Sequence, residues 1–537
     1  MIVNTENIGE VMFTPTQEQI DIIEAFKTTR MLKVNAYAGT GKSSTLKLLA
    51  EANPESSLYI AFNKSIAQEA DSKFPNHVEC RTTHSLAFAA FGHQLMHKLN
   101  RPKGKYVNVA GTPSEIAKYY GITEFPVTDE DEDNLNCNMV AKLVRDTIKR
   151  YEQSSDETLG KKHVPAYTIV EYTKNRPSLN KEHLIKEVMM YAERLWEDRK
   201  NVHSNVLATH DTYLKLFQLS NPKLNYNIIY LDEAQDTGDA VLDIVLKQDH
   251  AKIVLVGDNY QSIYQWRGAI NAMQKVNCPV KYLTKSFRFG QEIADVATKI
   301  ISAKRPVIGY EDVDSGVGVL DYDKPHTRIY RTNGALLAEA VEFLSQGSSV
   351  SCEIDTRDFQ KLIESALELK KGNIKGVKHD SIVPYATWEE MKDAAEEEPE
   401  IKRVINIISQ GKDGIFLQSL KHMKMKSDAD ITFTTAHKSK GREWSQVYIA
   451  EDFKNPDKSG KLPEQERNLL YVAATRATDK LFVNDSIMML LEVSEKRSYK
   501  NSGESRAGMA NFFLEAEFEA EMYRDDWETQ GWGMTGL

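Results

Sequence analysis

A phosphate-binding loop is the clearest chemical feature of the sequence. The eight residues Ala36–Ser43 (AYAGTGKS) separate a short apolar run from a helical pattern that begins at Ser44. Glycines in such a loop let backbone N–H groups surround phosphates, while a lysine reaches the outer oxygens and a hydroxyl binds Mg²⁺. Because Ala36 replaces the usual first glycine, a chance turn before a helix remains the alternative. The residues expected to bind ATP are Ala38, Gly39, Thr40, Gly41, Lys42, Ser43 and Ser44, with Ser43 also a ligand of Mg²⁺.

Two adjacent carboxylates, Asp232 and Glu233, follow a second apolar run at 228–231. Hydrolysis of ATP needs one carboxylate for the metal ion and another that orients the attacking water. We therefore expect Asp232 to bind Mg²⁺ and Glu233 to act as general base. The alternative is that these adjacent acids are only part of a solvated loop or a helix cap. The phosphate-binding loop around Lys42 favours the ATPase site over this alternative.

Short β-branched apolar runs alternate with longer helical patterns along the chain. Strands that alternate with helices predict parallel sheets covered on both faces. The runs fall into two sets, so we expect an α/β protein with two parallel-sheet cores. The first set is 31–35, 57–62, 227–231, 252–256 and 280–283, and the second is 327–331, 431–435, 446–450 and 480–483.

Two mainly helical stretches interrupt these cores. In the first, Leu184, Val188, Ala192 and Leu195 form one apolar stripe. The expected parts are a first core at 1–91 and 206–285 with an insertion at 92–205, a second core at 286–343 and 427–495 with a short insertion at 344–426, and an acidic, aromatic tail at 496–537.

The tail has its own helical pattern. Leu514, Phe518 and Met522 recur at helical spacing between acidic residues. We expect this helix to dock on one of the protein's own cores. A helix that binds a protein partner is the alternative.

Composition limits the class of protein. The 537 residues carry 68 basic and 78 acidic side chains, a net charge of −10, which argues against a coat protein that binds nucleic acid indiscriminately but leaves room for a local basic channel. No apolar run reaches the roughly 18 residues of a membrane span. The four cysteines lie far apart, so we expect no disulfide framework or zinc module. These features favour a reducing compartment: the cytoplasm, at the nucleoid, or the nucleus of a eukaryote. We expect the protein to be a monomer.

An ordered series of segments resembles the UvrD/Rep-like superfamily 1 DNA helicases. The segment Val256–Ala269 (VGDNYQSIYQWRGA) is the most specific of them. The segments Thr209–Leu216 and Phe62–Lys64 are most similar to the F-box DNA helicase branch, although we recognise no F-box. The resemblance implies RecA-like cores with ATP between them. The other segments of the series are Phe13–Gln17, Thr83–Ala87, Asp232–Asp236, Ser286–Arg288, Thr434–Trp444 and Tyr471–Ala477.

The resemblance also implies roles around the nucleoside of ATP. Gln17 would recognise adenine, Phe287 would stack on it where the family more often has tyrosine, and Glu443 would contact the ribose.

Three further residues would act on the γ-phosphate. By resemblance, Gln261 senses it, and Arg288 and Arg476 stabilise the transferring phosphoryl group. A surface ion pair is the alternative for either arginine.

Single-stranded DNA needs aromatic platforms for bases and donors for phosphates. Tyr264 and Trp266 closely follow Gln261, so one element would contact both ATP and DNA; the alternative is that both rings belong to the core. Phe62 is a weaker candidate for stacking. The residues expected at the DNA are Phe62, Asn63, His84, Tyr264, Trp266, Arg267 and His437.

These features together predict an ATP-dependent DNA helicase that uses Mg²⁺, moves 3′ to 5′ on single-stranded DNA by resemblance, and opens single-strand/duplex junctions. RNA stays open as a track. The alternatives are a translocase that strips proteins from DNA, a nucleotide-gated DNA-binding protein, and the motor part of a helicase–nuclease.

Overall fold

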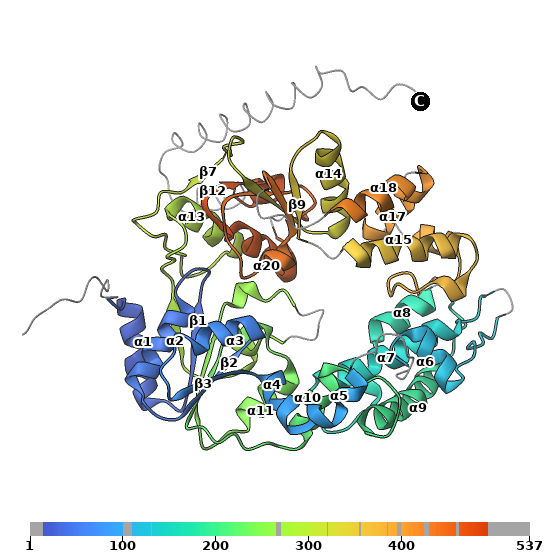
Figure 1. Ribbon diagram of the computed structural model, residues 1–537, viewed down its shortest axis with the longest axis horizontal. Coiled ribbons are helices and arrows are strands. Elements are labelled where there is room, and N and C mark those ends of the chain that lie inside the picture. Colours follow the sequence, from blue (N-terminus) through green and yellow to red (C-terminus); the bar gives the residue numbers. More distant parts are fainter. Residues whose placement is uncertain are drawn as a thin grey trace, which may run out of the picture.

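The computed structural model describes residues 14–491 except 100–109, 130–131, 175, 265–269, 319, 354–355, 384, 395–398, 412, 424–428 and 458–460. The described residues form two six-stranded sheets whose strands all pair in parallel, with helices around them (Figure 1). The predicted α/β class with two RecA-like cores is confirmed. Within these residues, no helix has the length and apolarity needed to cross a membrane. The tail at 496–537, with its expected docking helix, lies outside the described residues.

The first sheet has the strand order β3-β2-β4-β5-β1-β6. Its four central strands are almost entirely buried, as expected where helices cover both faces of a parallel sheet, whereas the edge strands β3 and β6 are partly exposed. β3 was not predicted from the sequence. The strands are β1 (Met31–Ala36), β2 (Ser57–Ala61), β3 (Val78–Thr82), β4 (Ile228–Leu231), β5 (Lys252–Gly257) and β6 (Val280–Leu283).

Two hydrophobic clusters sandwich the first sheet, one on each face. One face is covered by α1 (Gln17–Thr28), α2 (Lys42–Ala52) and α3 (Lys64–Asp71). The other face carries α4 (Thr83–Ala87), the π-helical turn η1 (Phe88–Gly92), α5 (His93–Leu99), α10 (His210–Leu219), α11 (Asp239–Leu246) and α12 (Ala272–Lys275).

Local capping fixes where these helices begin. Thr16 and Gln19 form a reciprocal capping box at the start of α1, which satisfies two backbone N–H groups. Thr82 caps α4, and Thr332 caps α14 (Asn333–Ser345). In each case the threonine side-chain oxygen accepts a hydrogen bond from a backbone N–H of the first turn.

The first insertion has a hydrophobic core of its own, in which the predicted stripe from Leu184 to Leu195 is buried. The expected start at residue 92 is corrected, because α5 packs through Leu95 into the core of the first sheet. The helices of the insertion are α6 (Pro113–Tyr120), α7 (Cys137–Gln153), η2 (Lys161–His163), α8 (Ala166–Lys174) and α9 (Lys181–Lys200).

The second sheet has the strand order β7-β12-β11-β8-β10-β9. One face packs against α13 (Gln291–Ile301), α19 (Ala436–Ser439) and α20 (Glu464–Ala474). The strands are β7 (Gly316–Val317), β8 (His326–Tyr330), β9 (Val350–Cys352), β10 (Ile431–Thr435), β11 (Trp444–Ile449) and β12 (Ala477–Phe482).

The expected second insertion at 344–426 also needs correction. β9 lies inside that range but pairs with β10, so it belongs to the second sheet. The helices that follow share one hydrophobic cluster with α14 and with β8 and β10, because their apolar faces have the sheet to pack against. They are α15 (Thr356–Lys370), η6 (Ile374–Gly376), α16 (Trp388–Ala394), α17 (Pro399–Ser409) and α18 (Asp413–His422).

Candidate active site and nucleic-acid interface

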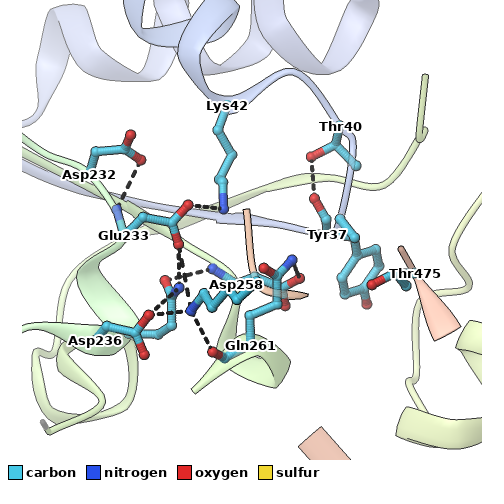
Figure 2. Close-up of polar contacts among 12 residues, drawn as sticks. Tyr37, Thr40, Lys42, Asp232, Glu233, Asp236, Asp258, Gln261 and Thr475 are labelled. Carbon is cyan, nitrogen blue, oxygen red and sulfur yellow. Dashed lines mark hydrogen bonds and ion pairs between the residues drawn. The ribbon is translucent and has the colours of Figure 1, made fainter. Parts of the chain in front are cut away.

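The predicted phosphate-binding loop lies between β1 and α2, at the contact between the two cores. Gly39 and Gly41 have φ angles of +73° and +75°, which favour glycine. Gly39 also has no room for a side chain, since a Cβ atom there would lie 2.6 Å from the Cβ of Arg288. The Thr40 hydroxyl donates to the carbonyl oxygen of Tyr37 at 2.8 Å (Figure 2). The loop is thus held in a tight turn against a residue of the polypeptide that leads into the second core.

One of the two predicted acids, Glu233, contacts the predicted lysine. Lys42 Nζ lies 2.7 Å from Glu233 Oε1 (Figure 2). Asp232 accepts a hydrogen bond of 2.5 Å from the Tyr59 hydroxyl and another of 2.9 Å from the backbone N–H of Glu233. Glu233 itself has a positive φ of 50°, a conformation that costs energy for a residue with a side chain. This backbone turn directs the Glu233 carboxylate towards Lys42.

The pKa values of the two carboxylates are shifted in opposite directions. Burial works to raise the pKa of Glu233, but Lys42 and then Lys440 outweigh it and hold that pKa at about 2. Burial, followed by the charge of Glu233, raises the pKa of Asp232. Glu233 is therefore ionised at neutral pH, as a general base must be.

A second acidic group, Asp258, joins the two cores. The Tyr471 hydroxyl of α20 donates to Asp258 Oδ2 at 3.0 Å and accepts from the backbone N–H of Ala38, also at 3.0 Å. Gln261 Nε2 donates to the same Asp258 oxygen at 2.8 Å. Tyr471 lay within a segment of the family resemblance, and Asp258 did too, but neither was assigned a role. The network ties the predicted γ-phosphate sensor, Gln261, to the phosphate loop.

The predicted arginines lie at the same contact. Arg288 Nε lies 2.9 Å from Glu443 Oε2, and its Nη1 donates to the Thr475 carbonyl oxygen at 3.1 Å. Arg476 is buried, with Nε donating to the Val472 carbonyl oxygen at 2.8 Å. Burial, with the charge of Arg288 beside it, lowers the pKa of Arg476 to about 9. The structure therefore brings Arg288 and Glu443 together. Arg476 lies beside Arg288 and is buried.

The nucleoside residues are only partly brought together. Phe287 is about one-third exposed, and its backbone N–H donates to the Gly39 carbonyl oxygen at 2.8 Å. Gln17 lies on the surface, where its amide donates to Asp21. The buried Gln19, which the sequence did not single out, donates to the Thr45 hydroxyl at 3.0 Å beside the phosphate loop.

Three of the residues predicted at DNA form one aromatic group. The rings of Phe62 and Tyr264 are nearly parallel, with centroids 6.0 Å apart. The Tyr264 hydroxyl donates to the His437 carbonyl oxygen at 2.9 Å, so a second-core residue supports a first-core ring. Phe62 is half exposed and available to a base.

The other predicted DNA residues are not in this group. Asn63 caps α3 by accepting from the Ile66 N–H at 2.9 Å. His84 lies instead 3.5 Å from Asp211 of α10, within the first core. Trp266 and Arg267 lie outside the described residues.

The described residues offer few ligands for a metal ion. They contain no group of three or more histidine, cysteine or acidic side chains arranged to hold an ion. Ser43 and Asp232 do offer oxygen atoms at the phosphate loop, the donor type that Mg²⁺ binds together with phosphate oxygens.

Comparison with known proteins identifies relatives along most of the chain. The UvrD/REP helicase N-terminal domain matches residues 16–277, and the UvrD-like helicase C-terminal domain matches residues 430–483. F-box DNA helicase 1 of Gallus gallus is 31% identical over 91% of this chain and 51% of its own length. F-box DNA helicase protein 1 of Schizosaccharomyces pombe is 31% identical over 88% of this chain and 58% of its own. The chain thus spans just over half the length of these relatives.

Proposed function

The chain belongs to the UvrD-like helicases, and from this premise we propose that it is an ATP-driven motor that moves 3′ to 5′ on single-stranded DNA and unwinds duplex at a junction. The observation that carries the proposal is the convergence of both cores on one phosphate-binding loop. Lys42 of the loop pairs with Glu233 of the first core, and Arg288 lies against the loop from the side of the second. Such a site opens and closes with the cores, as a motor requires.

ATP would lie with its phosphates along the loop. Ser43 and Asp232 would hold Mg²⁺, which neutralises charge on the phosphate oxygens when bound. Glu233 would take the proton of the attacking water, since its low pKa keeps it ionised. Arg288 and Arg476 would stabilise the charge of the transferring group from the other core.

Single-stranded DNA would run over the group of Phe62, Tyr264 and His437. Rings from this group can stack on bases without selecting a sequence. Tyr264 lies three residues after Gln261, so the element that senses ATP also presents a ring to DNA. This arrangement supports coupling of hydrolysis to movement, at the nucleoid or, in a eukaryote, in the nucleus.

The test begins with ATP turnover in the presence and absence of oligothymidylate, followed by strand separation on duplexes with a 3′ or a 5′ single-stranded tail. We expect stimulation by the oligonucleotide and unwinding from the 3′ tail. Unwinding from the 5′ tail alone would contradict the polarity. Stimulated turnover with displacement of streptavidin from biotinylated DNA, but without strand separation, would favour the stripping translocase.

A further inference from the structure

Lys440 is a second-core residue whose ammonium group lies among acidic groups of the first core. It directly follows α19, and its side chain is 10% exposed. Nζ forms a short hydrogen bond to Asp236 Oδ2 and a second, of 2.7 Å, to the Gln261 carbonyl oxygen. Glu233 Oε2 lies 4.0 Å from the same nitrogen. One cation from the second core thus contacts both the proposed general base and the backbone of the proposed γ-phosphate sensor.

The same ammonium group faces the ring of Tyr264. Nζ lies 5.5 Å from the ring centroid, within the range of a cation–π interaction. Two residues from one short segment therefore hold this ring, because His437 accepts the Tyr264 hydroxyl. The ring of Phe62 stacks on the ring of Tyr264. Any movement of the Tyr264 ring changes the surroundings of Lys440.

The charge of Lys440 acts on the proposed general base, Glu233. Burial raises the pKa of Glu233, and Lys42 followed by Lys440 overcomes that effect. Burial also raises the pKa of Asp236, to about 6, although Lys440 opposes the rise. Lys440 is therefore, after Lys42, a cation whose charge favours the ionised carboxylate of Glu233. The charged and polar groups around Glu233 are Lys42, Asp232, Gln235, Asp236 and Lys440.

We propose that Lys440 is a positioning residue that transmits the occupancy of the Tyr264 ring by DNA to the groups that hydrolyse ATP. The inference rests on the proposed function. A base stacked on Tyr264 fixes the ring, and the ring fixes the ammonium group beside it. Lys440 then holds the Gln261 backbone and the Glu233 carboxylate in place for hydrolysis. The segment Thr434–Trp444 was recognised in the sequence, but nothing there assigned Lys440 a role.

The test compares Lys440→Met with the wild-type chain, because methionine keeps the length of the side chain and removes its charge. ATP turnover is measured with and without saturating oligothymidylate. We expect stimulated turnover to fall about tenfold more than basal turnover, the factor associated with one hydrogen bond to a charged group. Lys440→Arg keeps the charge and should restore most of the stimulation. Lys438→Met, which removes an exposed lysine of α19 two residues before Lys440, should leave the ratio unchanged.

A purely structural role would lower basal and stimulated turnover in proportion, and that result would overturn the proposal. A second readout is the rescue by Lys440→Arg, and an equal loss of stimulation in Lys440→Met and Lys440→Arg also contradicts the proposal. If Lys440→Met does not fold, the double variant Lys440→Met/Asp236→Asn removes both charges of the buried pair and takes its place. Wild-type protein without DNA-stimulated turnover would overturn the proposed function as well as this role, whereas an unchanged ratio in the variant overturns this role alone.

Discussion

Lys42 Nζ lies 2.7 Å from Glu233 Oε1, so the lysine expected to bind phosphate is paired with the carboxylate expected to act as general base. Burial works to lower the pKa of Lys42, but the charges of Glu233, Asp232 and Asp258 together outweigh burial, and the pKa is raised. An incoming phosphate chain would compete with Glu233 for Lys42. That exchange would free the carboxylate to accept a proton from water.

Replacement of either member of this pair should stop hydrolysis in a different way. Lys42→Ala should abolish turnover and leave single-stranded DNA binding largely intact, because the ammonium group serves phosphate and not DNA. Glu233→Gln should still bind ATP but turn over about 10² to 10⁴ times more slowly, the usual contribution of a general base. Phosphate release and fluorescence anisotropy of labelled oligothymidylate measure the two properties. Near wild-type turnover in either variant would show that the site is wrongly assigned.

The stacked rings should contribute to DNA affinity. Phe62→Ala or Tyr264→Ala should weaken binding of single-stranded DNA by about 1–3 kcal/mol, the value of one lost base stack. Tyr322→Ala removes an exposed ring of the second core outside this group and serves as the matched control. Anisotropy titrations at fixed salt would measure the difference. Equal affinities for Phe62→Ala and the control would remove Phe62 from the proposed DNA path.

Much of the site could be predicted because its segments are local in sequence. Lys42 follows one buried strand and Glu233 another, so an apolar run with polar residues after it locates both. In the sheet, β5 alone separates β4 from β1, and parallel strands bring their carboxyl ends to one edge. Two separate sequence patterns therefore describe one place in the fold.

Contacts between the cores could not be predicted in this way. Tyr471 and Asp258 lie 213 residues apart, and Lys440 and Asp236 lie 204 apart, so no local pattern joins them. β9 was missed because its three residues are too short a run to show a period of two. Only the packing of the second sheet indicates that this segment is a strand.

Burial of Asp236 should make stability depend on pH. Its pKa is raised by burial to about 6, so between about pH 4 and 6 the folded chain binds a proton that the unfolded chain does not. Stability gained from this group is therefore present at low pH and lost as the pH rises through 6. Asp236→Asn should remove the effect, which is worth at most about 3 kcal/mol. Thermal unfolding at several pH values should show the unfolding temperature of Asp236→Asn rising relative to that of the wild type as the pH rises. A difference in unfolding temperature that does not change with pH would contradict the assignment.

The Tyr471 hydroxyl should stabilise the contact between the cores. Tyr471→Phe leaves the Ala38 N–H without its acceptor and Asp258 without one of its donors, which costs about 1–3 kcal/mol for each buried group left unsatisfied. We expect a lower unfolding temperature together with weaker ATP binding, because the phosphate loop loses a support. Tyr260→Phe is the matched control, since the Tyr260 ring packs on Tyr471 at 6.0 Å. A similar effect in both variants would attribute the loss to packing instead of hydrogen bonding.

The helices inserted in the two cores also contact each other. Arg145 Nη1 of α7 lies 3.0 Å from Asp380 Oδ1, and Arg176 Nη1 lies 3.3 Å from Glu390 Oε1 of α16. Figure 1 shows α7 and α8 of the first insertion on the same side of the molecule as α15. The second pair is much better shielded from water, with side-chain exposures of 3% and 15%, while Asp380 is 53% exposed.

This difference in burial predicts how the two pairs respond to mutation. A double-mutant cycle on Arg145 and Asp380 should give a coupling energy of at most about 1 kcal/mol that shrinks in high salt, as for exposed ion pairs. Arg176→Ala should destabilise the chain by about 3 kcal/mol or more, because it breaks the better shielded of the two ion pairs. Chemical unfolding of the single and double variants at low and high salt measures both quantities. Zero coupling between Arg145 and Asp380 at low salt, together with equal losses for Arg145→Ala and Arg176→Ala, would mean that the two sets of helices do not touch in solution.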